Sequence, residues 1–241
     1  MNARMATVHH CRDYQDMSRE AAAHVIAAAV AKNESLLCLP AGNSPAGLYQ
    51  NLIREAERKP GLFRRLRVVK LDEWLGVPAG EAATCEHFLR SRILDPLEIE
   101  AERYISFDSE TADPLRECAK VNGELERQGP IDLCILGLGK NGHVGLNEPG
   151  PSLRLHCHVA KLSEETLRHA MITSSEAKPR FGLTLGIGDI LHARKIVLLI
   201  TGEGKERVIA RFLDGTVTTD LPASFLWLHH DLEVFLDDSC A

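Results

Sequence analysis

The chain has 241 residues, of which 44% are hydrophobic and 26% are charged, and its formal net charge at pH 7 is −6. This composition is typical of a globular protein that can bury a sizeable core. The negative balance argues against a nucleic acid or an anionic membrane as partner, because both attract a basic surface. A small anionic substrate is still compatible, since it needs only a few local donors.

Targeting signals are not evident in the sequence. No stretch holds the 18 or more apolar residues of a membrane span, and the segment MNARMATVHHCRDYQDM lacks the apolar core of a secretory signal. The seven cysteines are scattered, and Cys38, Cys134 and Cys157 lie in stretches typical of strands. We therefore expect reduced, mostly buried thiols and a cytoplasmic location.

Short apolar stretches alternate along the chain with amphipathic ones. In chain order the pattern predicts a strand at 35–40, a helix at 44–59, a strand at 66–74, a helix at 84–97, a strand at 103–107, a helix at 113–128, strands at 131–139, 157–162, 180–186 and 195–201, a helix at 204–215 and a strand at 232–237. This alternation is typical of βαβ units. The expected fold class is α/β, a Rossmann-like three-layer sandwich with a mostly parallel central sheet, in one domain spanning 1–241.

In such sheets ligands bind at the carboxyl ends of the strands, in loops that lead into helices. The first of these loops, 40–45, contains Gly42, Ser44 and Pro45. Ser44 suits a helix N-cap, Pro45 suits the first turn, and Gly42 lets the backbone approach a ligand. The loop therefore predicts either a phosphate site at a helix N-terminus or a plain capped helix start.

Two adjacent carboxylates, Asp72 and Glu73, close the strand predicted at 66–74. This is a position where a general base would be useful. Successive strand side chains point to opposite faces, so only one of the two is expected to face a site. The alternative is a solvated turn with a helix-capping acid.

The loop after the strand at 131–139 contains a G-x-G-x-x-G pattern, with Glu164 and Glu165 about twenty residues later. A dinucleotide site would need a helix to open at the third glycine, and Pro149-Gly150 interrupts any such helix. The loop also carries His143 and Glu148, which suit proton transfer by an imidazole supported by a carboxylate. A histidine without function is the alternative.

The loop at 201–205 places Lys205 at the start of a predicted helix. It does not match the nucleotide-binding P-loop pattern, so a single phosphate is the better candidate ligand, with a solvated lysine as alternative. Clusters of histidine and cysteine occur at 9–11, 156–158 and 229–230. None has the spacing of a zinc site, so we expect no metal.

The motifs LPAGNSP, VVKLDEW, IDLCILGLGKNGHVGLNEPGPSL, GLTLGIGDIL and ITGEGK, in that order, resemble the glucosamine-6-phosphate deaminase and 6-phosphogluconolactonase superfamily. The resemblance covers about residues 20 to 235. The G-H-x-x-x-N-E-P-G run is similar to the deaminase branch and unlike the lactonases. KLDEW, TCEHFL, GLGKNGH, TGEGKE and PASFLWLH are more similar to galactosamine-6-phosphate isomerases than to the glucosamine enzymes.

This resemblance implies a role for each matching position. Asp72 would move a proton between C2 and C1 of the open-chain sugar, and His143 would open the ring with Glu148 as its partner. The phosphate would be bound by Gly42, Asn43, Ser44 and Lys205, with Arg180 as a further contact. The reaction converts a hexosamine 6-phosphate, expected to be galactosamine 6-phosphate, into tagatose 6-phosphate plus ammonia, without a cofactor.

Two departures from the family pattern affect finer expectations. Asn141 stands where many glucosamine enzymes carry an acid, and an amide cannot stabilise an imidazolium as a carboxylate does. The segment 151–160 is less basic than in allosteric hexameric relatives, which also have a longer C-terminal tail. We therefore expect no allosteric activation by an amino-sugar phosphate, and a monomer or small homo-oligomer.

Three alternative functions are kept open. A glucosamine-6-phosphate deaminase differs only in the sugar, and one hydroxyl orientation at C4 separates the two substrates. A 6-phosphogluconolactonase is disfavoured by Glu148. A non-catalytic sugar-phosphate sensor is disfavoured by the presence of Asp72 and His143, and no helix-turn-helix pattern precedes the first predicted strand.

Overall fold

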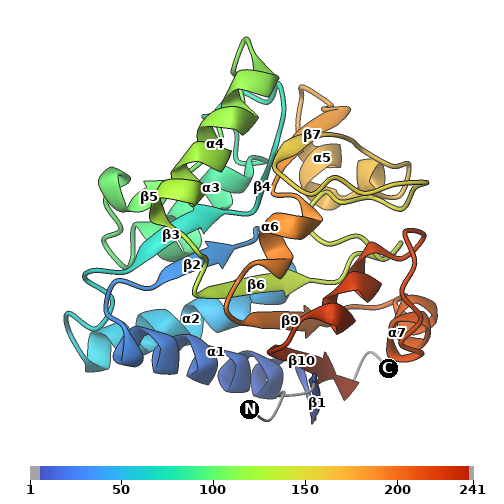
Figure 1. Cartoon of the computed structure of the whole chain (residues 1–241). Helices are drawn as coiled ribbons and strands as arrows, with labels where there is room; N and C mark the ends of the chain where they lie inside the picture. Colours follow the sequence, from blue (N-terminus) through green and yellow to red (C-terminus); the bar gives the residue numbers. More distant parts are fainter. Residues whose placement is uncertain (1–5, 239–241) are drawn as a thin grey trace.

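The structure is a computed structural model that describes residues 6–238, and a seven-stranded parallel sheet forms its centre (Figure 1). Its strands, in spatial order, are β1 (Thr7–Cys11), β10 (Leu232–Asp237), β9 (Ile196–Ile200), β6 (Leu133–Gly137), β2 (Leu36–Leu39), β3 (Arg67–Lys70) and β5 (Tyr104–Ile105). The predicted α/β class with a mostly parallel sheet is confirmed.

Side chains of the central strands alternate between two separate cores. In β6, Leu133 and Ile135 pack into the core shared with α1 (Tyr14–Ala31) and α2 (Asn43–Arg58). Cys134 and Leu136 pack into the opposite core, which receives α4 (Pro114–Gln128), α6 (Ile187–Leu191) and α7 (Glu206–Leu213). A strand that is covered on both faces has apolar side chains at consecutive positions, which is why polar and apolar residues do not alternate in β6 and β9.

The strand predicted at 66–74 is two strands in two sheets. Leu71 N–H still donates to Leu39 O of β2, but Leu71 O accepts from Leu185 N–H, so the chain changes partner at this residue. The next residues form β4 (Asp72–Trp74), which joins β8 (Phe181–Thr184) and β7 (His158–Lys161) in an antiparallel sheet. The strands expected at 157–162 and 180–186 therefore exist, but outside the parallel sheet.

The N-terminal strand β1 and helix α1 are absent from the sequence-based prediction. Asp13 caps α1 by accepting from Asp16 N–H at 2.8 Å, so a start signal was present. The helix itself, YQDMSREAAAHVIAAAVA, is rich in alanine, which weakens the contrast between its buried and exposed faces. The helix predicted at 84–97 also differs, because α3 (Cys85–Leu89) continues as a π-helix at Arg90–Leu94.

The remaining elements are short. They are the 3-10 segments Ala101–Arg103, Thr166–Arg168 and Pro222–Leu228, and the helix α5 (Ala170–Ser174). The six cysteines within residues 6–238 are buried and form no disulfide, whereas Cys240 lies outside the described residues. None of the helices in the same range combines the length and apolar character that a membrane span needs.

Candidate active site

A cavity of about 1150 Å³ lies at the carboxyl edge of the parallel sheet. The strands β9, β6, β2 and β3 are consecutive neighbours there. After β2 the chain continues to β3 on one side of the sheet, whereas after β6 the next strand of the parallel sheet is β9, on the other side. The direction in which strands are added therefore reverses between the neighbours β2 and β6. Open α/β sheets bind ligands at such a switch point, because the two diverging loops leave a crevice. The four loops singled out from the sequence therefore converge here.

The first wall of the cavity is the N-terminus of α2. Gly42 precedes the helix with φ 115°, a backbone conformation that favours glycine, and α2 begins at Asn43. Ser44 thus lies in the first turn and is not the N-cap that the sequence suggested. The first N–H groups of a helix lack intrahelical partners, and no side chain caps this one. The cavity wall therefore presents donors suited to an anion.

Tyr14 of α1, which the sequence analysis missed, fixes this helix start. Its hydroxyl donates to Asn43 O at 2.7 Å and accepts from Gly47 N–H at 2.7 Å. The absence of a side chain at Gly47 allows this close approach, because a Cβ there would lie 2.9 Å from Tyr14 Cε1 and 2.3 Å from Ser18 Oγ. The missed helix α1 thus positions the loop that the sequence did identify.

Asp72 lies in the cavity wall, and Glu73 points to the opposite face of β4. Burial, and after it the charge on Glu73, raise the pKa of Asp72 to about 7, although the charges of His143 and Lys70 act in the opposite direction. A carboxylate with a pKa near neutrality is well matched to proton abstraction at physiological pH. The geometry thus selects Asp72 over Glu73 as the candidate base.

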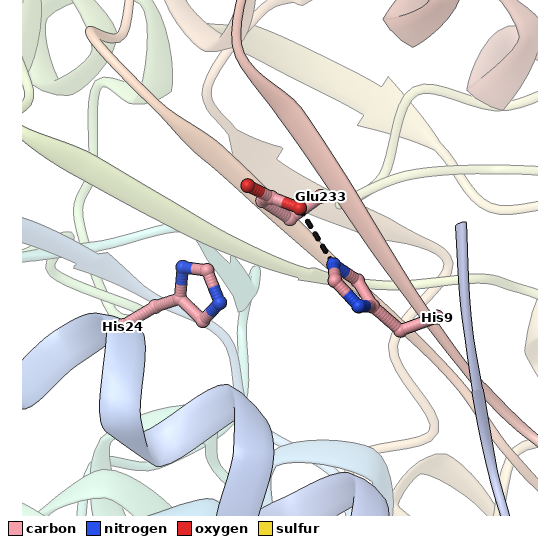
Figure 2. Close-up of side chains that lie close together, drawn as sticks. All are labelled: His9, His24 and Glu233. Carbon is pink, nitrogen blue, oxygen red and sulfur yellow. Dashed lines mark hydrogen bonds and ion pairs between the residues drawn. The ribbon is translucent and has the colours of Figure 1, made fainter. Parts of the chain in front are cut away.

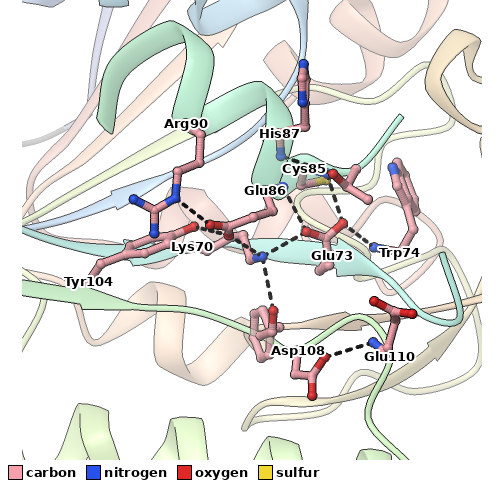
Figure 3. A network of polar contacts seen from close by, with 12 residues as sticks. Lys70, Glu73, Trp74, Cys85, Glu86, His87, Arg90, Tyr104, Asp108 and Glu110 are labelled. Carbon is pink, nitrogen blue, oxygen red and sulfur yellow. Dashed lines mark hydrogen bonds and ion pairs between the residues drawn. The ribbon is translucent and has the colours of Figure 1, made fainter. Parts of the chain in front are cut away.

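Glu73 organises a buried ionic network with Lys70 and Glu86 (Figure 3). Its carboxylate accepts from Lys70 Nζ at 2.8 Å and from the backbone N–H groups of Trp74, Cys85 and Glu86. Lys70 Nζ also donates to Glu86 Oε2 at 2.9 Å. The network ties β4 to the N-terminus of α3, where a negative charge is favourable.

His143 faces the same cavity from the loop after β6. Its Nδ1 lies 3.4 Å from Glu148 Oε2, and a Cβ at Gly139 would lie 2.4 Å from its Nε2. The imidazole therefore lies directly over the glycine backbone, with Glu148 behind it. Burial by itself raises the pKa of Glu148, but the hydrogen bond and charge of His143, aided by Thr166 and Asn141, lower it to about 2. Glu148 is a carboxylate that stays ionised beside the imidazole.

Asn141 contacts Glu148 and not the imidazole ring. Its Nδ2 donates to Glu148 Oε2 at 2.8 Å and to Ser163 Oγ at 3.1 Å, while its Oδ1 accepts from His143 N–H. Ser163 N–H and the Thr166 hydroxyl donate to the other carboxylate oxygen. Asn141 thus orients the carboxylate of Glu148, which lies against the imidazole of His143. No local sequence signal marked Ser163 or Thr166, because a distant segment brings them here.

Cationic side chains line the same cavity as the N-terminus of α2. Lys205 lines the cavity at the start of α7, and Lys140 and Arg168 line it as well. Arg180, in contrast, is exposed and is not among the cavity-lining residues. The arginine that the structure places at the cavity is Arg168, in the segment that also supplies Thr166. The loop at 137–150 contains no helix, as expected from Pro149-Gly150.

Outside the cavity, residues 6–238 contain one group of possible metal ligands, which lies between α1 and the edge of the sheet (Figure 2). Ligand atoms of His9, His24 and Glu233 lie within 4.8 Å of one another. Glu233 already accepts from His9 Nε2 at 2.7 Å and from Lys195 Nζ at 3.1 Å. The carboxylate of Glu233 thus has hydrogen-bond partners without a metal ion, so we assign the cluster to packing of the sheet edge against α1.

Comparison with known proteins identifies the family. The model of "Glucosamine-6-phosphate isomerases/6-phosphogluconolactonase" matches residues 12–235. The chain belongs to this family. It is 41% identical over 223 residues to AgaI of Escherichia coli (strain K12), whose designation as a deaminase is provisional, covering 92% of this chain and 88% of that one. It is 35% identical to a glucosamine-6-phosphate deaminase of Thermoanaerobacter sp. (strain X514), covering 95% and 91%.

Solved structures agree with this assignment. A monomeric glucosamine-6-phosphate deaminase superimposes with a TM-score of 0.91 at 31% identity, over 96% of this chain and 97% of that one. A 6-phosphogluconolactonase from Trypanosoma brucei superimposes with a TM-score of 0.78 at 21% identity, over 96% and 95%. The latter shows a shared fold alone. The expectation of an enzyme of the isomerase and deaminase type is confirmed.

Proposed function

We propose that this chain converts galactosamine 6-phosphate and water into tagatose 6-phosphate and ammonia. The observation that carries the proposal is the pairing of Asp72 and His143 across one cavity whose wall is a helix N-terminus with cationic neighbours. The hexosamine 6-phosphate class follows from the relatives, and the galacto sugar from the resemblance of KLDEW and PASFLWLH to galactosamine enzymes.

The phosphate is the anchor of the substrate in this proposal. It accepts from backbone N–H groups at Gly42, Asn43 and Ser44 and pairs with Lys205 and Arg168. Binding energy from this remote group holds C1 and C2 against the catalytic side chains, which makes proton transfer effectively intramolecular.

His143 opens the pyranose ring by moving a proton between the C1 hydroxyl and the ring oxygen. Glu148 supports the imidazolium that forms, and because its low pKa keeps it ionised, no second acid is needed at Asn141. Opening exposes the C1 aldehyde, which acidifies the proton on C2.

Asp72 then removes the C2 proton and returns it to C1. The electron pair of the C2–H bond forms a C1=C2 double bond as the C1 oxygen takes up a proton released by the 2-ammonium group, and protonation at C1 then draws the nitrogen lone pair into a C2=N bond. Water hydrolyses this 2-imino sugar, which releases ammonia and leaves the C2 ketone. A carboxylate and an imidazole supply every proton transfer, so the proposal includes no metal or organic cofactor. Positioned acid–base groups of this kind typically contribute about 10² to 10⁴ in rate.

Ammonia release from each hexosamine phosphate tests the proposal. The protein is incubated separately with galactosamine 6-phosphate and glucosamine 6-phosphate, with Asp72→Asn as the matched variant. We expect release from the galacto sugar and a loss of about 10² or more in Asp72→Asn. Release from the gluco sugar only would overturn the substrate, and folded protein inactive on both would overturn the reaction.

A further inference from the structure

Trp74 shares the cavity face of β4 with the candidate base. Side chains alternate along a strand, so Asp72 and Trp74 lie on one face while Glu73 points to Lys70 on the other. Both Asp72 and Trp74 are cavity-lining residues. Two residues of strand span about 6.6 Å. A group at position 74 can therefore contact a part of the substrate beyond the carbons that Asp72 serves.

The indole of Trp74 carries a donor that lacks an acceptor. The residue is 5% exposed, and its Nε1 has no hydrogen-bond partner among residues 6–238. In Trp227, by comparison, Nε1 donates to Phe212 O at 2.7 Å. A buried indole N–H normally finds an acceptor, because leaving it unpaired costs free energy. Because Trp74 is one of the residues that line the cavity, a ligand bound there is a candidate source of the acceptor.

The surroundings of Trp74 narrow the chemistry of that acceptor. Trp74 belongs to a small apolar cluster and its ring centroid lies 6.3 Å from that of His169. The apolar members of this cluster are Val77, Cys85, Leu146, Ala160, Leu162 and Ile172. An apolar wall with one neutral donor suits a hydroxyl oxygen better than a phosphate, and a protonated amine cannot accept a hydrogen bond.

We propose that Trp74 Nε1–H donates a hydrogen bond to a sugar hydroxyl and that Trp74 is a specificity-determining residue of this site. The inference rests on the proposed function and deepens it. A site that pairs a buried donor with a substrate hydroxyl discriminates against a sugar that places the hydroxyl elsewhere, because the donor is then left unpaired.

The first test compares Trp74→Phe with Trp227→Phe. Phenylalanine keeps an apolar ring and removes the donor, and Trp227 lies outside the residues that line the cavity. We expect Trp74→Phe to lower kcat/KM about tenfold for at least one of galactosamine 6-phosphate and glucosamine 6-phosphate, and Trp227→Phe to leave kcat/KM unchanged. A decrease in kcat/KM for only one of the two sugars identifies the C4 hydroxyl as the acceptor. An equal decrease for both sugars identifies a hydroxyl that the two sugars have in common.

A second measurement separates hydrogen bonding from packing. Inorganic phosphate is used as a competitive ligand without hydroxyls on carbon. Its inhibition constant stays within twofold in Trp74→Phe if only a sugar contact is lost. A parallel weakening of phosphate binding would assign Trp74 to packing and overturn the proposal.

The two-tryptophan composition allows a third, isosteric test. In the Trp227→Phe background, Trp74 can be replaced biosynthetically by the benzothiophene analogue of tryptophan, in which sulfur takes the place of the N–H. We expect the same tenfold effect on kcat/KM, and a change below twofold for both sugars would overturn the proposal. If the parent protein releases no ammonia, the proposed reaction is wrong, but the role of Trp74 can still be tested. Calorimetric dissociation constants for the two sugar phosphates are then compared between the parent and the variants: a tenfold weakening supports the proposal and a change below twofold for both sugars overturns it.

Discussion

At the scale of single residues, the environment of Asp72 sets the pH dependence. In the proposed mechanism Asp72 must be ionised to act, and its pKa is about 7, so we expect activity to be full above this pH and to be lost below it. We expect kcat/KM to fall about tenfold per pH unit on the acid side of about pH 7. A pH–rate profile of the parent enzyme measures this limb. A limb near pH 4, the ordinary range for an aspartate, would contradict the inferred environment.

A second prediction at the scale of single residues concerns Gly139. Replacing it by alanine would drive a Cβ to 2.4 Å from His143 Nε2, so the imidazole must move away from its position. We expect Gly139→Ala to lower kcat/KM about 10²-fold while the protein stays folded. Gly123→Ala on α4 is the matched control, since a Cβ there meets no atom within 4 Å. Activity of Gly139→Ala within threefold of the parent would contradict the assigned role of His143.

At the scale of elements, the network around Glu73 holds β4 in place. Glu73→Gln removes the negative partner of the buried Lys70 and should lower the free energy of unfolding by about 3 kcal/mol. It also removes a charge that raises the pKa of Asp72, so the acid limb of kcat/KM should move to lower pH. Thermal unfolding and pH–rate profiles measure the two effects.

The matched variant for this network is Glu86→Gln. Glu86 shares Lys70 with Glu73 but is partly exposed, and its carboxylate accepts no backbone N–H of the β4–α3 connection. We expect a smaller loss of stability and little movement of the acid limb. An acid limb that moves to higher pH in Glu73→Gln would refute the electrostatic account of Asp72.

At the scale of the whole molecule, we expect hyperbolic saturation by the substrate. The segment 151–160, PSLRLHCHVA, contains one arginine and no lysine, so it offers few cationic groups to a second sugar phosphate. We therefore propose a monomer or small homo-oligomer in which a second amino-sugar phosphate activates nothing. Initial-rate kinetics and sedimentation test both points. Sigmoidal kinetics or a hexamer would contradict the expectation.

Much of the element order could be predicted from the sequence, for local reasons. Apolar runs such as 195–201 and amphipathic stretches such as 113–128 carry their periodicity within themselves, and β9 and α4 lie within those ranges. The break at Leu71 carries no such signal. Both halves of 66–74 are extended, and only the partners Leu39 and Leu185, from distant segments, divide them between two sheets.

The candidate site shows the same division. The sequence by itself determined that Asp72, His143 and Lys205 follow strands and must meet at one edge, because parallel strands align their carboxyl ends. Only the tertiary structure decided that Asp72 and not Glu73 faces the cavity, that Arg168 and not Arg180 lines it, and that Ser163 and Thr166 donate hydrogen bonds to Glu148. These outcomes depend on burial and on segments far apart in the chain, and neither is encoded in local periodicity.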